Sequence, residues 1–296
     1  MGKLQLKGVI PPMITPFTEN EDLDYGMHVR NMELWGREEL CGYLVLGSNS
    51  ETVYLTEEEK LELIRLTVEN TGKDKLILAG TGMESARETI RLTNKAAKLG
   101  IHGALVLTPF YYGSQMTNEA LIRYFTQVAD NSEVPVLIYN VPKFTHVNVP
   151  AEVVRELSRH PNIIGMKDSV GDVGQLVKFK SVIPEDFNLI VGTASAWYPA
   201  LTLGINTGIM ALANCMPREC IMVQKAYEEG RDKDARELYL KLFPVNTAVT
   251  ATFGIAGLKY ACELMGYHGG YVRSPLLMPK EEEKRKIEGI ISAAVK

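Results

Sequence analysis

The stretch NIIGMKD, residues 162–168, combines two features that decide how this chain should fold. Its apolar residues Ile163, Ile164 and Met166 do not alternate with polar ones, which is typical of a parallel strand covered on both faces. The stretch nevertheless reaches Lys167, although an unpaired ammonium group away from water is costly. We therefore expect a buried strand that carries a charge at its carboxyl end for a chemical or an electrostatic reason.

Seven more apolar runs of this kind occur, and helix-like stretches lie between them. The eight runs are GVIPPMIT (8–15), GYLVLG (42–47), KLILAG (75–80), GALVLT (103–108), VPVLIYN (134–140), NIIGMKD (162–168), FNLIVGT (187–193) and TGIMALAN (207–214). Among the helical stretches, 56–72 is the clearest, because Thr56 can cap it, Glu59 follows three residues later and Gly72 ends it. Eight strands alternating with helices predict an α/β fold, the (β/α)8 TIM barrel. A doubly wound open sheet is the alternative, but no G-x-G-x-x-G turn follows the first run.

The strand pattern stops near residue 220. The rest of the chain shows amphipathic helical segments only, and no low-complexity linker separates it from what precedes. We therefore expect residues 1–220 to form the barrel with the active site, and residues 221–296 to form a C-terminal helical extension packed on it.

Composition excludes several classes of protein. The 296 residues carry a net charge of −4 without a basic stripe, so we expect no nucleic-acid partner. No apolar run approaches the roughly 18 residues of a membrane span, and the first residues do not show the pattern of a signal peptide, so we expect neither. The four cysteines form no C-x-x-C pair, which favours free thiols in a reducing compartment, the cytoplasm. The five histidines lack metal-ligand spacing, so we expect no metal.

Polar or aromatic residues end six of the predicted strands. Catalytic groups of a (β/α)8 barrel come from this face, the carboxyl ends of the strands and the loops after them. The six ends are GSNSE (47–51), AGTG (79–82), TPFYYG (108–113), YNVP (139–142), Lys167 and GTAS (192–195). Together they predict a pocket with hydroxyl groups, one amine and little carboxylate.

Lys167 is the amine in this set. A lysine removed from water more readily loses its proton, and the neutral amine can attack a ketone to form a Schiff base. Such chemistry needs a proton shuttle, and Tyr139 at the end of the adjacent strand can provide one. The alternative is an ion pair at the barrel rim between Lys167 and Asp168 or Asp172.

Ser48 and Asn49 lie in the turn after the second strand. Their side chains and backbone N–H groups could hold a carboxylate or an oxyanion. The alternative is a turn that caps the following helix. Tyr111 and Tyr112 have the same ambiguity, because an aromatic pair at a barrel rim often has no catalytic role.

Four motifs in this order resemble one known family. They are GSNSE after the second strand, TPFY after the fourth, YNVP after the fifth and GMKD at the sixth. In combination they resemble the pyruvate-dependent, lysine-Schiff-base aldolases of the dihydrodipicolinate synthase / N-acetylneuraminate lyase family. The resemblance extends from about residue 7 to residue 290.

The resemblance implies a role for each candidate residue. By position, Lys167 would bind pyruvate as a Schiff base, Tyr139 would shuttle protons, Ser48 and Asn49 would bind the pyruvyl carboxylate, Tyr111 would reach into a neighbouring subunit's site, and Gly192 and Ile209 would line the pyruvate pocket. It also implies a homotetramer built as a dimer of dimers, with small-molecule substrates and no metal or organic cofactor.

The second substrate depends on finer features. Dihydrodipicolinate synthases generally carry Y-N-V-P-x-R-T, whose arginine holds the carboxylate of aspartate semialdehyde, whereas this chain has YNVPKFT with Phe144 in that place. The Ser48–Asn49 pair, KDSVGD, ALAN, FGIAGLK and GYHGG most resemble 4-hydroxy-2-oxoglutarate aldolases, in which case Ser169 and Asn49 would help position the substrate. The alternatives are a dihydrodipicolinate synthase, a 2-keto-3-deoxy sugar acid aldolase or dehydratase, and, outside enzymes, a non-catalytic 2-oxo-acid sensor.

Overall fold

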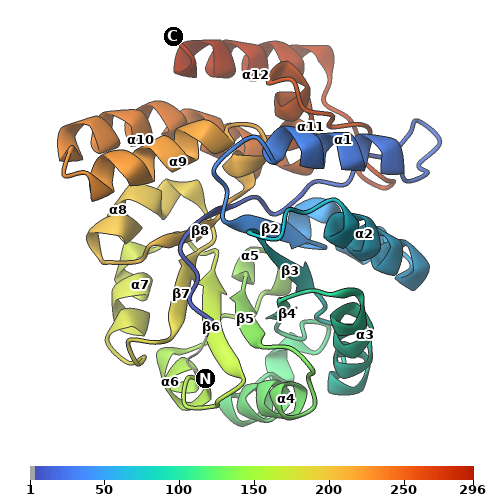
Figure 1. Ribbon diagram of the computed structural model, residues 1–296, viewed down its shortest axis with the longest axis vertical. Helices are drawn as coiled ribbons and strands as arrows, with labels where there is room; N and C mark the ends of the chain where they lie inside the picture. Colours follow the sequence, from blue (N-terminus) through green and yellow to red (C-terminus); the bar gives the residue numbers. More distant parts are fainter. Residues whose placement is uncertain (1–3) are drawn as a thin grey trace.

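Eight parallel strands form a nearly closed barrel in the computed structural model, which describes residues 4–296 (Figure 1). The strands are β1 (Gly8–Ile10), β2 (Gly42–Val45), β3 (Leu76–Gly80), β4 (Gly103–Leu107), β5 (Val136–Asn140), β6 (Ile163–Asp168), β7 (Asn188–Val191) and β8 (Thr207–Ile209). Their order is β1-β8-β7-β6-β5-β4-β3-β2, and Cys41 N donates to Val9 O (3.1 Å) where β1 approaches β2. The predicted TIM barrel is confirmed.

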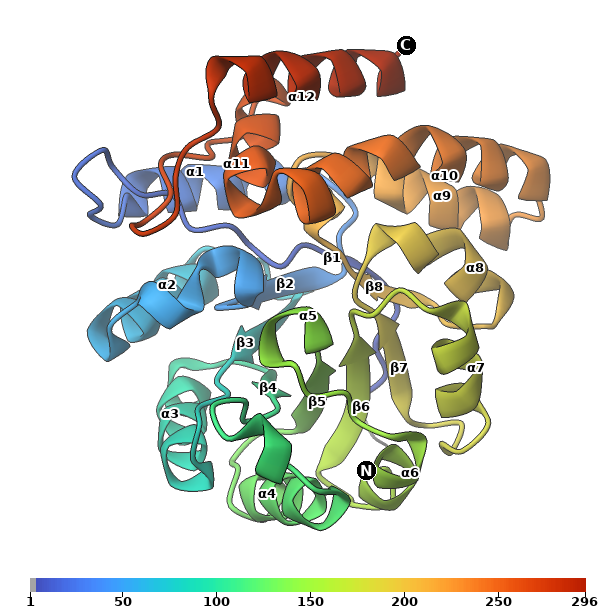
Figure 2. The same cartoon turned by 180° about the vertical axis from the view of Figure 1, so that it is seen from behind.

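Helices surround the strands and continue beyond them (Figures 1 and 2). They are α1 (Tyr25–Trp35), α2 (Glu57–Glu69), α3 (Ala86–Leu99), α4 (Asn118–Asp130), α5 (Pro142–Thr145), α6 (Ala151–Leu157), α7 (Val173–Lys180), α8 (Trp197–Thr202), α9 (Pro217–Glu228), α10 (Asp232–Thr247), α11 (Gly254–Leu264) and α12 (Glu281–Ala294). Short 3₁₀ turns include η1 (Ser48–Ser50), η2 (Thr52–Tyr54) and η5 (Ala211–Asn214), and η6 (Ala248–Thr252) is a π-helical turn. Within residues 4–296, no helix is long and apolar enough to cross a membrane.

The start of α2 follows the predicted capping box. Thr56 N donates to Glu59 Oε2 (2.8 Å), and Glu59 N donates to Thr56 Oγ1 (3.2 Å). The helix ends at Glu69, before the predicted stop at Gly72, because the Asn70 side chain donates to Leu66 O (2.8 Å) and closes the last turn.

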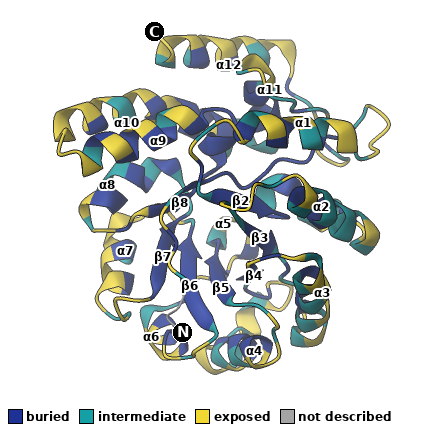
Figure 3. Cartoon of the chain, in the orientation of Figure 1, coloured by how far each residue is buried: buried dark blue, intermediate teal, exposed yellow. Residues whose placement is uncertain are grey.

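Apolar side chains fill two layers, one inside the barrel and one between the strands and helices. The inner layer contains one or two side chains from each of the eight strands, namely Ile10, Leu44, Leu78, Leu105, Leu137, Tyr139, Ile164, Ile190 and Ile209. The outer layer includes Trp35 of α1 and Phe125 of α4. Figure 3 shows the strands almost entirely buried, which is why their sequences do not alternate.

The C-terminal helices α10, α11 and α12 lie together at one end of the molecule, beside α1 (Figures 1 and 2). The preceding helix, α9, begins at Pro217 and runs through residue 220, where we expected the extension to begin. The boundary between barrel and extension therefore stays a prediction.

Candidate active site

Lys167 and Tyr139 lie side by side on neighbouring strands. They are register partners of β6 and β5, and Lys167 Nζ lies 4.3 Å from the centroid of the Tyr139 ring. Lys167 is 3% exposed and Tyr139 is 6% exposed. The two side chains thus form a nearly buried amine–phenol pair at the carboxyl end of the barrel.

Lys167 forms no ion pair with either neighbouring aspartate. Asp168 Oδ1 accepts hydrogen bonds from Asn140 Nδ2 (2.7 Å) and Gln175 Nε2 (3.0 Å), and Asp172 caps α7 by accepting from the backbone N–H of Gly174 (2.7 Å). Burial raises the pKa of the Asp168 carboxyl, and the hydrogen bond from Asn140 opposes that rise. Both candidate partners of the rim ion pair have other roles, and no ion pair within residues 4–296 includes Lys167.

Ser48 brings a hydroxyl group to this pair from η1. Ser48 Oγ lies 3.1 Å from Tyr139 OH, and Asn49 follows in the same turn. Neither residue caps the helix that follows, because Thr56 caps α2. The chain leaves η1 through Glu51, whose φ of 54° is in the left-handed region that few non-glycine residues adopt.

Gly192 is positioned by a close approach of β7 to β6. Its N–H donates to Asp168 O (2.7 Å), and a Cβ atom at this position would lie 2.0 Å from Ser169 Oγ. Because nothing larger than hydrogen fits there, the position requires glycine. Ser169 Oγ in turn lies 3.4 Å from Gly192 O.

Six of the eight candidate residues line one cavity of about 640 Å³, a size suited to a small ligand. They are Ser48, Asn49, Tyr139, Lys167, Ser169 and Gly192. The other two do not line it. Ile209 is fully buried in the inner layer of the barrel, and Tyr111 is 76% exposed with its ring edge-on to Tyr112.

Part of the cavity lining, the C-terminal wall, comes from residues between 246 and 277, which we had not assigned to the site. Its residues include Asn246, Thr250, Phe253, Ile255 and Leu277, together with Lys143 of α5. The FGIAGLK motif, residues 253–259, was the sequence signal that could have indicated this wall.

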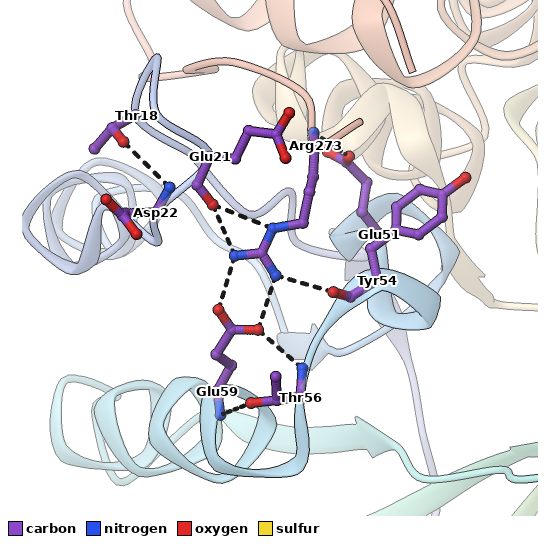
Figure 4. Close-up of polar contacts among 8 residues, drawn as sticks. All are labelled: Thr18, Glu21, Asp22, Glu51, Tyr54, Thr56, Glu59 and Arg273. Carbon is purple, nitrogen blue, oxygen red and sulfur yellow. Dashed lines mark hydrogen bonds and ion pairs between the residues drawn. The ribbon is translucent and has the colours of Figure 1, made fainter. Parts of the chain in front are cut away.

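A buried ion pair joins this C-terminal region to the turn that carries Ser48 and Asn49. Lys259 Nζ of α11 lies 2.6 Å from Glu51 Oε1, and both side chains are almost inaccessible. Burial lowers the pKa of Lys259 to about 8, while the Glu51 carboxylate opposes that shift. Glu51 Oε2 also accepts from the backbone N–H of Arg273 (2.9 Å), and the Arg273 guanidinium is bidentate on Glu59 (Figure 4).

The cavity offers two amines, a phenol, hydroxyls and amides. Of the described residues that line it, none is Asp, Glu, His or Cys. More widely, residues 4–296 contain no group of three or more such side chains that could hold a metal ion. The chemistry available to these side chains is therefore nucleophilic attack by an amine with proton transfer by a phenol.

Known proteins match the chain over almost its whole length. The model of the Dihydrodipicolinate synthetase family matches residues 5–294. A 4-hydroxy-tetrahydrodipicolinate synthase of Methanospirillum hungatei is 32% identical, with 97% of this chain and 98% of that protein covered. A dihydrodipicolinate synthase of Bacillus anthracis superposes with a TM-score of 0.93 at 26% identity, over 98% of both chains. YagE of Escherichia coli K12, a protein of the same family solved in complex with pyruvate, also gives 0.93, at 27% identity over 99% of both chains.

Proposed function

The chain belongs to the dihydrodipicolinate synthetase family, and we propose that it is a class I lyase that binds pyruvate or another 2-oxo acid as a Schiff base on Lys167. One observation carries this proposal. Lys167 is a buried amine with no acid partner among residues 4–296, it lies against Tyr139, and it shares a cavity with Ser48 and Asn49.

In the proposed reaction, the neutral Lys167 amine attacks the C2 ketone of the 2-oxo acid and forms a carbinolamine. Loss of water gives an iminium, which accepts the electron pair of the breaking C3–C4 bond as the aldehyde leaves. The resulting enamine is protonated at C3, and water then releases pyruvate and the free amine. Tyr139 carries protons in these steps, and Ser48 is placed to take part because its hydroxyl is within hydrogen-bond reach of the phenol. Ser48, Asn49 and the neighbouring N–H groups would hold the carboxylate.

Two candidates exist for the second substrate. The names of the curated relatives support 4-hydroxy-tetrahydrodipicolinate synthase, which condenses pyruvate with aspartate semialdehyde, better than the aldolase that the motifs led us to expect. One observation favours the aldolase, namely Phe144, which stands in place of the substrate-binding arginine. Phe144 is 52% exposed and lines the cavity. Cleavage of 4-hydroxy-2-oxoglutarate or a similar 4-hydroxy-2-oxo acid is therefore the second candidate.

Borohydride trapping tests the shared step. Incubation with pyruvate and borohydride should attach the reduced adduct to Lys167, as peptide mass analysis would show, and Lys167→Arg should abolish it. Absence of the adduct from the wild-type protein would refute the Schiff-base proposal. Turnover of aspartate semialdehyde or of 4-hydroxy-2-oxoglutarate then separates the two candidates, and trapping without turnover of any acceptor would indicate a 2-oxo-acid sensor.

Assembly as a homotetramer is part of the same proposal. Tyr111 and Tyr112 are 76% and 64% exposed, and together they form an aromatic pair on the surface, outside this chain's own cavity. A second copy that covers them would bury a large apolar area. Sedimentation of the wild type and of Tyr111→Ala measures whether this pair contributes to assembly.

A reducing compartment, the cytoplasm, is the location that we propose. All four cysteines are free thiols, and Cys215, Cys220 and Cys262 are buried. Burial raises the pKa of the Cys220 and Cys262 thiols well above its ordinary value, which keeps them inert rather than reactive.

A further inference from the structure

The charge of the active-site cavity is unbalanced. The described residues that line it include two cations, Lys143 and Lys167, and no Asp or Glu. A concave surface with cations and no acids attracts anions and concentrates them. Lys167 is assigned to the Schiff base, so the second cation has no role in the reaction described above.

Lys143 lies on the side of the cavity formed by the C-terminal wall. It belongs to the short helix α5, directly after the strand that carries Tyr139. Its Nζ donates to the carbonyl oxygen of Thr250 (2.7 Å) and lies 5.6 Å from the Phe144 ring centroid. An ammonium group has three N–H donors, and this carbonyl uses one of them. No ion pair between side chains of residues 4–296 includes Lys143, so its positive charge is not neutralised within this part of the chain.

The turn that accepts the hydrogen bond of Lys143 has an irregular backbone. Thr250 lies in the π-helical turn η6, and such turns often occur at functional sites. Beside it, Asn246 is 2% exposed and lines the same cavity, and its Oδ1 has no hydrogen-bond partner among the described residues. A buried polar atom without a partner is costly. The wall therefore offers both an unused cation and an unused acceptor to a ligand.

We propose that Lys143 determines specificity by binding a second acid group, the one on the aldehyde half of the substrate. This inference rests on the proposed Schiff-base function and narrows its substrate class to 2-oxo acids with an acid at each end. The carboxylate at the reacting end binds at Ser48 and Asn49, and the distal carboxylate accepts from Lys143. A hydroxyl or amino group beside the distal acid can donate to Asn246.

Trapping by borohydride tests this without knowledge of the natural substrate. The probes are 2-oxoglutarate, which has an acid at each end, and 2-oxopentanoate, which has a methyl group in place of the distal acid. For Lys143→Met, the concentration of 2-oxoglutarate that half-saturates trapping should rise about 10-fold, the effect of losing one charge-assisted hydrogen bond. The value for 2-oxopentanoate should change less than about twofold. Lys143→Arg should retain the wild-type preference for the diacid.

Lys178→Met is the matched control, because Lys178 is an exposed lysine of α7 that does not line the cavity. If Lys143 only stabilises η6, Lys143→Met will weaken trapping of both acids equally, and the inference is wrong. It is also wrong if the wild type traps pyruvate but neither longer acid. Absence of trapping even with pyruvate is a different result, because it refutes the proposed function itself.

Discussion

Lys259→Met tests whether the buried ion pair holds the turn of Ser48 and Asn49 to the C-terminal helices. Lys259 Nζ and Glu51 Oε1 are 2.6 Å apart, and their side chains are 0% and 1% exposed. Glu51 also contacts Arg273 (Figure 4), because its Oε2 accepts a hydrogen bond from the backbone N–H of Arg273 (2.9 Å). Methionine has a similar length but no charge, so the substitution removes the cation and leaves the carboxylate buried.

The expected cost is about 3–5 kcal/mol in the free energy of unfolding, because the remaining carboxylate has no cation to compensate it. Burial has lowered the Lys259 pKa from 10.5 to about 8. The ammonium is therefore itself held in an unfavourable environment, which favours the lower end of that range. For a chain of 296 residues, a loss of about 3 kcal/mol should lower the Tm by about 5 °C.

Urea and thermal unfolding of five proteins measure this: the wild type, Lys259→Met, Glu51→Gln, the double variant and the control Lys178→Met. The double variant should recover most of the loss, because neither charge then remains unpaired, and Lys178→Met should unfold like the wild type. The half-saturating pyruvate concentration for trapping should rise in Lys259→Met as the turn of Ser48 loosens. A loss under about 1 kcal/mol, or a double-variant loss equal to the sum of the single ones, would refute the coupling.

Three other predictions concern single residues. Tyr139→Phe should keep the wild-type melting curve but slow turnover about 10²- to 10⁴-fold, and near-normal rates would reassign the proton shuttle. Gly192→Ala should cost about 1–3 kcal/mol in unfolding and weaken pyruvate trapping, because its Cβ would lie 2.8 Å from the backbone oxygen of Asp168, whereas Gly289→Ala, with open space around its Cβ, should not destabilise. Burial lowers the pKa of His28 to about 4 from 6.5, so the unfolded chain binds a proton between these pH values that the native chain does not. As the pH decreases from 6.5 to 4, the free energy of unfolding should therefore decrease by about 3 kcal/mol more in the wild type than in His28→Gln. Urea unfolding at several pH values measures this, and an equal decrease in both proteins would contradict it.

The barrel could be predicted because each strand is buried on both faces. Ile163, Ile164 and Met166 of β6 are fully or almost fully buried, so their continuous apolar run correctly indicated a strand covered on both faces. Other elements left weaker signals. The four-residue helix α5 is too short to show a periodic pattern. Helix α2 ends before the predicted stop at Gly72, because the Asn70 side chain donates to Leu66 O and closes the last turn.

The inner half of the candidate site could also be predicted, since the carboxyl ends of parallel strands meet at one face. Lys167, Tyr139 and Ser48 are all on strand ends or in the turn after one, and the structure brings them together. Asn246 and Thr250 lie on α10 and η6, outside the barrel strands, and no strand-end rule could place them in the cavity.

The sequence by itself determined the (β/α)8 architecture, the amine at the end of the sixth strand and the family motifs, because these follow from local pattern and from strand order. Only the tertiary structure decided what surrounds that amine. It placed the Asp168 carboxylate against Asn140 and Gln175, so that Asp168 does not pair with Lys167. It also brought Lys143 and the C-terminal wall to the same cavity. Such contacts depend on packing between segments that lie far apart along the chain, and a one-dimensional pattern does not record them.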